Sequence, residues 1–299
     1  MRRRPSRGST FSRSSRTRCR PTSASIRSGS MGVYAVPALY AVLLWWSATG
    51  LVLVLQHLPR RTHARSMVAA SAVLAGALWT IRAVADDDTE TGAYLGFTAA
   101  VIVWGWQEMS YYMGFISGPK PAACAPNLRG FDRFFAALAI SLWHEFAILI
   151  GGLTILCLTW GEGNRVALWT YGLLTLMNAS ARLNLFLGVR NLHAEFLPPH
   201  LGYLACYLSR RPMNPLFPLS VTLGTAATVL LARGALGDGA APETVTGFAL
   251  LATLAALATL EHWFLMLPLP SAALWNWSLP GRTAPTAAEM PETRAVHRE

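Results

Sequence analysis

The chain has little charge and almost no lysine. Only 13% of its 299 residues are charged, whereas soluble domains carry roughly 25%. Lys120 is the only lysine. Hydrophobic residues make up 53% of the chain, and the mean hydropathy is +0.36. This composition excludes a soluble globular enzyme.

Cysteine is also scarce and has no pattern. No two of the four cysteines have the CxxC spacing that is typical of zinc sites or redox motifs, and two lie in or beside apolar runs. We therefore expect neither a zinc site nor a disulfide framework, and we expect the cysteines to pack as small apolar side chains.

The formal net charge of +10 comes from one short segment. Residues 1–30 contain nine of the 25 Lys and Arg residues and none of the 15 acids, so the rest of the chain is nearly neutral. The charge therefore does not indicate a nucleic-acid-binding surface, and no nucleic-acid partner is expected.

Long apolar runs dominate the remainder. About 20 apolar residues are needed to span the hydrocarbon core as a helix, and backbone groups in lipid must be hydrogen-bonded internally. Seven stretches meet this requirement: 33–56, 67–85, 93–117, 134–160, 165–190, 216–232 and 245–267. The sequence predicts an all-α, polytopic membrane bundle of about seven transmembrane helices.

The distribution of arginine predicts the orientation of this bundle. Twelve Lys and Arg residues lie in the segments 57–66, 118–133, 190–215 and the C-terminal tail, whereas the alternate loops contain only Arg165 and Arg233. Because cytoplasmic loops are enriched in Lys and Arg, we expect an N-out, C-in orientation, with the C-terminus and the arginine-rich loops in the cytoplasm.

The basic N-terminal segment conflicts with that orientation, since nine arginines would have to cross the membrane. We interpret residues 1–30 as a disordered Arg/Ser-rich extension upstream of a true start at Met31. The alternatives are an inverted orientation of the whole bundle or a basic arm that binds anionic lipid. Residues 31–280 then form the membrane domain and 281–299 a disordered cytoplasmic tail.

Four of the expected helices carry ionisable residues, which are costly in a membrane and therefore indicate a function or a partner. With a rise of 1.5 Å per residue, all of them fall between the midplane and the cytoplasmic surface. This shared depth predicts one intramembrane polar or ligand site, formed by Glu108, His144, Glu145, Arg182, Glu261 and His262.

Three interpretations of that polar layer remain open. It can be a structural cluster in which Arg182 pairs with one glutamate and the histidines bind the others. It can be a metal site, since imidazole and carboxylate suit iron, zinc or manganese, although no HExxH spacing is present. It can also place a histidine as ligand to a chlorin magnesium or a haem iron.

Two further groups of residues are assigned structural roles. Ser180, Asn184 and Gly188 recur every four residues, which is typical of close helix packing in membranes. The loop 190–215 carries Arg190, Arg210 and Arg211, which we expect to contact lipid headgroups or a docking partner on the cytoplasmic side.

Several strings closely resemble the photosynthetic complex assembly protein 2 (PuhE-type) family of purple phototrophic bacteria, in collinear order over about residues 31–280. These strings are Trp45-Trp46-Ser-Ala-Thr-Gly, Leu58-Pro-Arg-Arg-Thr, Ala85-Asp-Asp-Asp-Thr, Trp104-Gly-Trp-Gln-Glu-Met-Ser, Phe186-Leu-Gly-Val-Arg-Asn-Leu, Glu195-Phe-Leu-Pro-Pro-His-Leu, Arg210-Arg-Pro-Met-Asn and Glu261-His-Trp-Phe-Leu-Met-Leu-Pro-Leu-Pro.

The resemblance implies a factor that assembles the photosynthetic apparatus, namely the reaction centre with its core antenna, and that is connected with bacteriochlorophyll supply. Expected partners are reaction-centre or antenna polypeptides, pigment-synthesis enzymes and the lipid bilayer. The cofactor is left open between transient bacteriochlorophyll and, with less support, a metal. No catalytic residue is assigned. The alternative is a membrane-embedded, metal-dependent enzyme of pigment or quinone metabolism.

Overall fold

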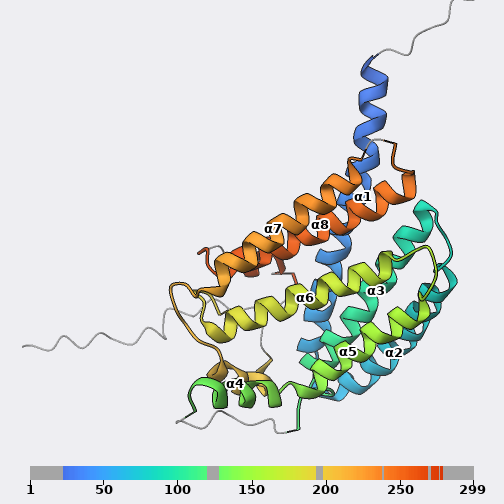
Figure 1. The fold of residues 1–299 in the computed structure, drawn as a ribbon. Coiled ribbons are helices and arrows are strands. Elements are labelled where there is room, and N and C mark those ends of the chain that lie inside the picture. The colour runs from blue at the N-terminus through green and yellow to red at the C-terminus, as the bar shows by residue number, and fades with distance from the viewer. Residues whose placement is uncertain are drawn as a thin grey trace, which may run out of the picture.

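A computed structural model describes residues 23–119, 128–192, 198–237, 239–268, 271–275 and 277–278. Over these ranges the chain is helical, and the one β-bridge that they contain joins Val189 to Arg210. Figure 1 shows the helices lying side by side, with α1 crossing behind the others.

Eight α-helices and two short 3-10 helices are present within these ranges. They are α1 (Ser23–His57), α2 (Arg60–Ala83), α3 (Glu90–Tyr112), α4 (Gly130–Ala139), α5 (Leu142–Leu158), α6 (Val166–Leu187), η2 (Pro199–Tyr207), α7 (Leu216–Ala235), α8 (Pro242–Phe264) and η3 (Ser271–Trp275). Most of the predicted extension 1–30 lies outside the described residues, but its last part, from Ser23, is helical in α1. The predicted tail 281–299 lies wholly outside them.

Four described helices are long and apolar enough to cross a membrane: α1 from Gly32 onward, α2, α7 and α8. The bent pair α4 and α5 makes a fifth if it is counted as one span. The helices α3 and α6 have sufficient length for a span but carry Glu108 and Arg182 within it. The protein is thus a multi-pass helical chain, whereas the number seven is not established by these helices.

The expectation of one continuous helix over 134–160 is wrong. The chain bends by 65° between α4 and α5. At this break the backbone N–H of His144 donates to the carbonyl of Ser117, 3.1 Å away, and Gly118 lies directly against the backbone of Ile140. The loop after α3 therefore occupies the position that a straight helix would need.

The helices α3 and α8 form the centre of the bundle. Phe97 and Val101 of α3 pack with Leu250 and Leu254 of α8 and with Ala41 of α1 in one apolar cluster. The neighbouring helix α7 approaches α8 closely at Gly224, where a Cβ atom would collide with the Thr259 hydroxyl. Small residues at such contacts are typical of membrane helix pairs.

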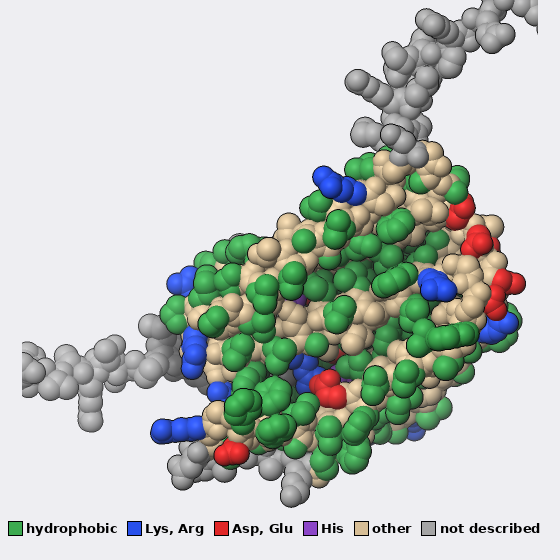
Figure 2. Space-filling view, viewed as in Figure 1, with side chains coloured by type: hydrophobic (Ala, Val, Ile, Leu, Met, Phe, Trp, Pro, Cys, Tyr) green, Lys and Arg blue, Asp and Glu red, His purple; other side chains and the backbone are tan. Residues whose placement is uncertain are grey.

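The outer surface of the bundle is apolar. Val68, Trp79 and Leu176 are each more than 70% exposed, and Figure 2 shows hydrophobic side chains over most of the visible face. Apolar surface of this extent is consistent with contact with a lipid bilayer.

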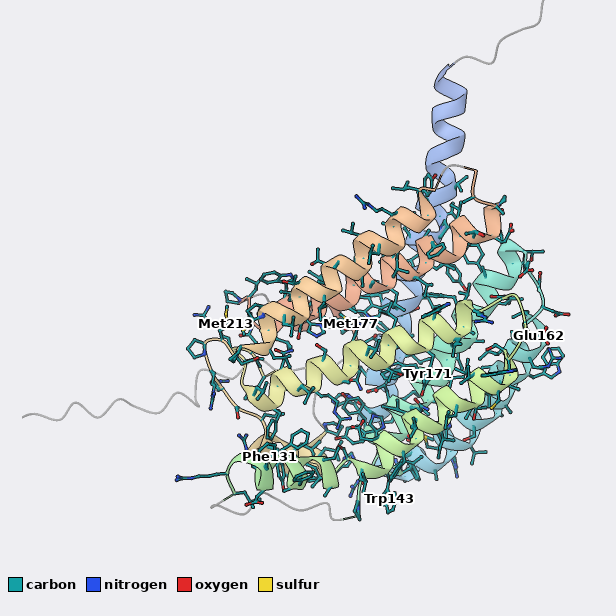
Figure 3. All side chains as sticks on the ribbon, in the orientation of Figure 1. Phe131, Trp143, Glu162, Tyr171, Met177 and Met213 are labelled. Carbon is teal, nitrogen blue, oxygen red and sulfur yellow. The ribbon has the colours of Figure 1, made fainter. Side chains whose placement is uncertain are left out.

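A buried polar contact joins three helices behind this surface. The Tyr171 hydroxyl of α6 lies 2.6 Å from Gln107 Oε1 of α3 and 2.8 Å from the carbonyl of Ile148 in α5. Gln107 also donates from Nε2 to the carbonyl of Ala147. Tyr171 lies in the second turn of α6, and Figure 3 shows it near α3 and α5. These bonds fix how α3, α5 and α6 are placed around the site described below.

The connections of the bundle gather at two ends of different charge. At the acidic end, Asn164 donates its backbone N–H to the carbonyl of Ala85, and Arg82 pairs with Glu162 at 3.6 Å. At the basic end, the rings of His63 and His200 lie 6.5 Å apart. In Figure 2 most of the acidic side chains gather at the right-hand edge, where basic ones also lie, and further basic side chains lie at the left.

Candidate functional site

A cavity of about 300 Å³ opens toward the basic end, between α3, α5, α6 and the segment that follows α6. Its wall is apolar on the side of Leu204 and Leu208. Most of the polar side chains in the wall come from α3, α5 and α6, and Tyr207 of η2 adds one more: Glu108, Tyr111, Tyr112, His144, Asn178, Arg182 and Tyr207.

Glu108 and His144 face each other across this cavity. His144 Nε2 lies 3.7 Å from Glu108 Oε1, and the two side chains are 1% and 18% exposed. This distance is too long for a hydrogen bond. Glu108 Oε1 and His144 Nδ1 are buried and have no hydrogen-bond partner within the described residues. The pair therefore retains unused hydrogen-bonding capacity.

Arg182 provides the positive charge at the same place. Its NH1 atom is 2.5 Å from Glu145 Oε1. Its guanidinium lies 5.6 Å from the centroid of the Tyr111 ring, within the range of a cation–π contact. The Tyr111 ring also stacks on His144, with centroids 4.4 Å apart. One tyrosine thus connects the arginine to the histidine.

Local helix geometry explains this arrangement. Adjacent residues on a helix point about 100° apart, so His144 points into the bundle while Glu145 faces Arg182 on α6. Tyr111 and Tyr112 lie one turn after Glu108 and share its face. The bend between α4 and α5 places His144 in the first turn of α5, at the level of the cavity.

Glu261 and His262 do not join this cluster, so the expected site of six residues is divided. His262 Nε2 lies 3.0 Å from the Ser180 hydroxyl, and its Nδ1 lies 2.8 Å from the carbonyl of Ala258. Glu261, the preceding residue of α8, points in a different direction from His262 and accepts a hydrogen bond of 3.1 Å from Trp45 Nε1.

The predicted packing stripe lies against α7 and α8. The hydroxyl of Ser220 on α7 is 2.9 Å from both Ser180 Oγ and Asn184 Nδ2. At the C-terminal end of α6, Asn214 donates from Nδ2 to the carbonyl of Gly188 at 2.8 Å. His262 completes this polar contact through Ser180. It therefore belongs with the helix-packing residues in the structure.

Arg190, Arg210 and Arg211 are all exposed near the basic end. Arg210 and Arg211 are held by the backbone pairing around Val189. The backbone N–H of Arg211 donates to the carbonyl of Val189.

Nearby, burial lowers the pKa of the His200 imidazole, and Arg60 lowers it further.

The described residues contain no group of three His, Cys, Asp or Glu side chains that could hold a metal ion. Glu108 and His144 supply two candidate ligands, and Glu145 is engaged with Arg182. The cavity can instead accept a polar group that donates to the carboxylate and interacts with the imidazole.

Sequence reasoning did not include Tyr111 and Tyr112 in the site. The signal was present, since both stand one helical turn after Glu108 in Glu108-Met-Ser-Tyr-Tyr. Apolar and aromatic positions are common in membrane helices, however, and a tyrosine beside an acid does not by itself indicate a cavity. The contact with Trp45 was equally hidden, because it joins residues 216 positions apart.

Residues 31–286 match the model of a family described as "Protein of unknown function (DUF3623)". A relative from Rhodobacter capsulatus, the "Uncharacterized 30.4 kDa protein in puhA 5'region", is 38% identical over 258 residues, which cover 84% of this chain and 94% of the relative. No solved structure matches the chain.

Proposed function

The chain belongs to the family described as Protein of unknown function (DUF3623), and on this premise we propose that it is an integral membrane factor for assembly of the bacterial photosynthetic apparatus. The observation that carries the proposal is the place of its relative in the 5′ region of puhA. The resemblance of eight collinear strings to the PuhE-type assembly family supports it.

We propose seven transmembrane helices, N-out and C-in, in the cytoplasmic or intracytoplasmic membrane. The segregation of basic and acidic connections to opposite ends supports this orientation. Cys157 is free and exposed at the C-terminal end of α5, toward the acidic end. A membrane-impermeant maleimide applied to intact cells labels it only if that end is outside.

The cavity suggests how such a factor holds its client. A volume of about 300 Å³ is at the lower limit of ligand pockets. It therefore favours a single polar side chain of a client helix over a bacteriochlorophyll ring with its tail. In this mechanism Glu108 and His144 bind the polar group, and the basic end contacts the lipid headgroups or the client's cytoplasmic segments.

A membrane-embedded, metal-dependent enzyme is the alternative. It would need further ligands beside Glu108 and His144, since neither Glu261 nor His262 lies in the cavity.

Purification from native membranes in a mild detergent distinguishes the two functions. We expect reaction-centre or antenna polypeptides to co-purify, as identified by mass spectrometry, and metal analysis to find less than one ion per chain. Stoichiometric iron, zinc or manganese without photosynthetic polypeptides would support the enzyme instead. A Glu108→Gln variant that loses such a metal would locate it in the cavity.

A further inference from the structure

A second and larger cavity, of about 570 Å³, lies at the acidic end between α6 and the α7–α8 pair. Helices α6 and α7 meet closely where Ser180 contacts Ser220. Toward the acidic end they leave a groove between α6 and the α7–α8 pair. Figure 2 looks onto this face, where hydrophobic side chains predominate and acidic ones gather at the right-hand edge.

The interior of this groove is apolar. Its walls are formed by Trp169, Leu173 and Leu176 of α6, Leu231 of α7, and Phe248 and Leu251 of α8. Trp169 and Leu176 are 62% and 71% exposed, so the groove opens along the outer, lipid-facing surface. A groove with these properties accommodates a hydrocarbon chain.

Charged residues lie at the mouth of the groove. Asp88 precedes α3, Arg165 precedes α6, and Glu243 lies in the first turn of α8. Within the described residues, none of these three side chains has a hydrogen bond or an ion pair. Asp87, also at the mouth, already accepts the backbone N–H of Thr89 at 3.0 Å. The mouth therefore presents one free cation and two free carboxylates.

We propose that this groove binds one phospholipid with a primary ammonium headgroup, that is, a phosphatidylethanolamine of the surrounding bilayer. Its phosphate pairs with Arg165, its ammonium donates hydrogen bonds to Asp88 and Glu243, and one acyl chain occupies the groove between α6 and α8. The proposal does not depend on the role in photosynthetic assembly.

The charges at the mouth select among lipid headgroups. An anionic phosphatidylglycerol could pair with Arg165, but its headgroup has no cation for the two carboxylates and its charge is repelled by them. The quaternary ammonium of phosphatidylcholine has no N–H to donate. Of these three lipids, only the one with the ethanolamine headgroup provides both a phosphate and a hydrogen-bonding cation.

Native mass spectrometry of the full chain, released from nanodiscs of defined composition, tests this proposal. With equal amounts of the three lipids, we expect one retained phosphatidylethanolamine per chain. Asp88→Asn with Glu243→Gln should reduce the preference over phosphatidylglycerol about fivefold, which is the size expected for partly exposed ion pairs. Arg165→Ala should weaken the retention of both phosphatidylethanolamine and phosphatidylglycerol.

Two further variants separate headgroup recognition from the apolar groove. Gly172 of α6 lines the groove, and a Cβ atom there meets nothing within 4 Å. Gly172→Leu should therefore displace the acyl chain and abolish retention of the lipid without unfolding the helix. Arg233→Ala, at the same end but outside the groove, is the matched control and should change nothing. Equal retention of all three lipids, or a preference that Asp88→Asn with Glu243→Gln leaves intact, overturns the proposal.

Discussion

An Arg182→Met variant is expected to lose most of its assembly function. The substitution removes the positive charge that pairs with Glu145 and that lies over the Tyr111 ring. Glu145 is then left without its partner inside a membrane helix. Because the two side chains are 30% and 37% exposed, we expect a loss of about 2 kcal/mol, less than for a fully buried pair. That energy corresponds to a change of about thirtyfold in an equilibrium constant.

The measurement is the near-infrared absorption of photosynthetic complexes in membranes of a strain that lacks the gene and is complemented with each variant. The amount of the protein itself is followed by immunoblotting. Arg182→Lys keeps the charge but loses the planar guanidinium over Tyr111, so it should restore the complexes only in part.

A double variant separates structure from function at this site. Glu145→Gln with Arg182→Met leaves no unpaired charge, and it should recover much of the stability lost in Arg182→Met. If the complexes nevertheless remain low, the arginine acts on the client. Full recovery of the complexes in the double variant would show that the pair only holds α5 to α6.

A Gly188→Val variant is expected to fail to fold in useful amounts. The φ angle of Gly188 is +122°, a conformation that side-chain-bearing residues, and β-branched ones above all, rarely adopt. A Cβ atom there would also come within 3 Å of the Arg211 side chain. The backbone at this point accepts the Asn214 hydrogen bond and begins the pairing of Val189.

Strain of this kind costs on the order of 1–3 kcal/mol, and the steric clash adds to it. Thermal unfolding of the detergent-solubilised protein, followed by circular dichroism, should show a lower midpoint and a reduced folded yield. Gly76→Ala is the matched control. Gly76 lies in α2 with open space around its Cβ position, and alanine favours a helix over glycine, so its stability should be equal or higher. A Gly188→Val variant as stable as Gly76→Ala would contradict this prediction.

The helices could be predicted largely from the sequence, because each apolar run in lipid can only be a helix. The break between α4 and α5 could not. Neither Ile140 nor Ser141 is a residue that ends helices, and the bend depends on the bond from His144 to Ser117, a contact that joins two segments of the folded chain.

The depth of the candidate site in the membrane could be predicted from the sequence, but the direction in which each side chain points could not. Counting residues along each helix placed Glu108, His144 and Arg182 at one level, and the structure does bring them together. The same counting placed Glu261 and His262 there as well. Helix rotation decides which of two adjacent residues faces which neighbour, and the apolar surroundings of α8 contain no pattern that reveals its rotation.

Deletion of the gene in its native host tests the central claim most directly, with the ratio of assembled reaction-centre and core-antenna complexes to total bacteriochlorophyll as the readout. The account predicts that pigment is still made while assembled complexes fall severalfold, and that the wild-type gene restores them. Unchanged complexes, or the loss of bacteriochlorophyll itself with accumulation of a biosynthetic intermediate, would contradict it.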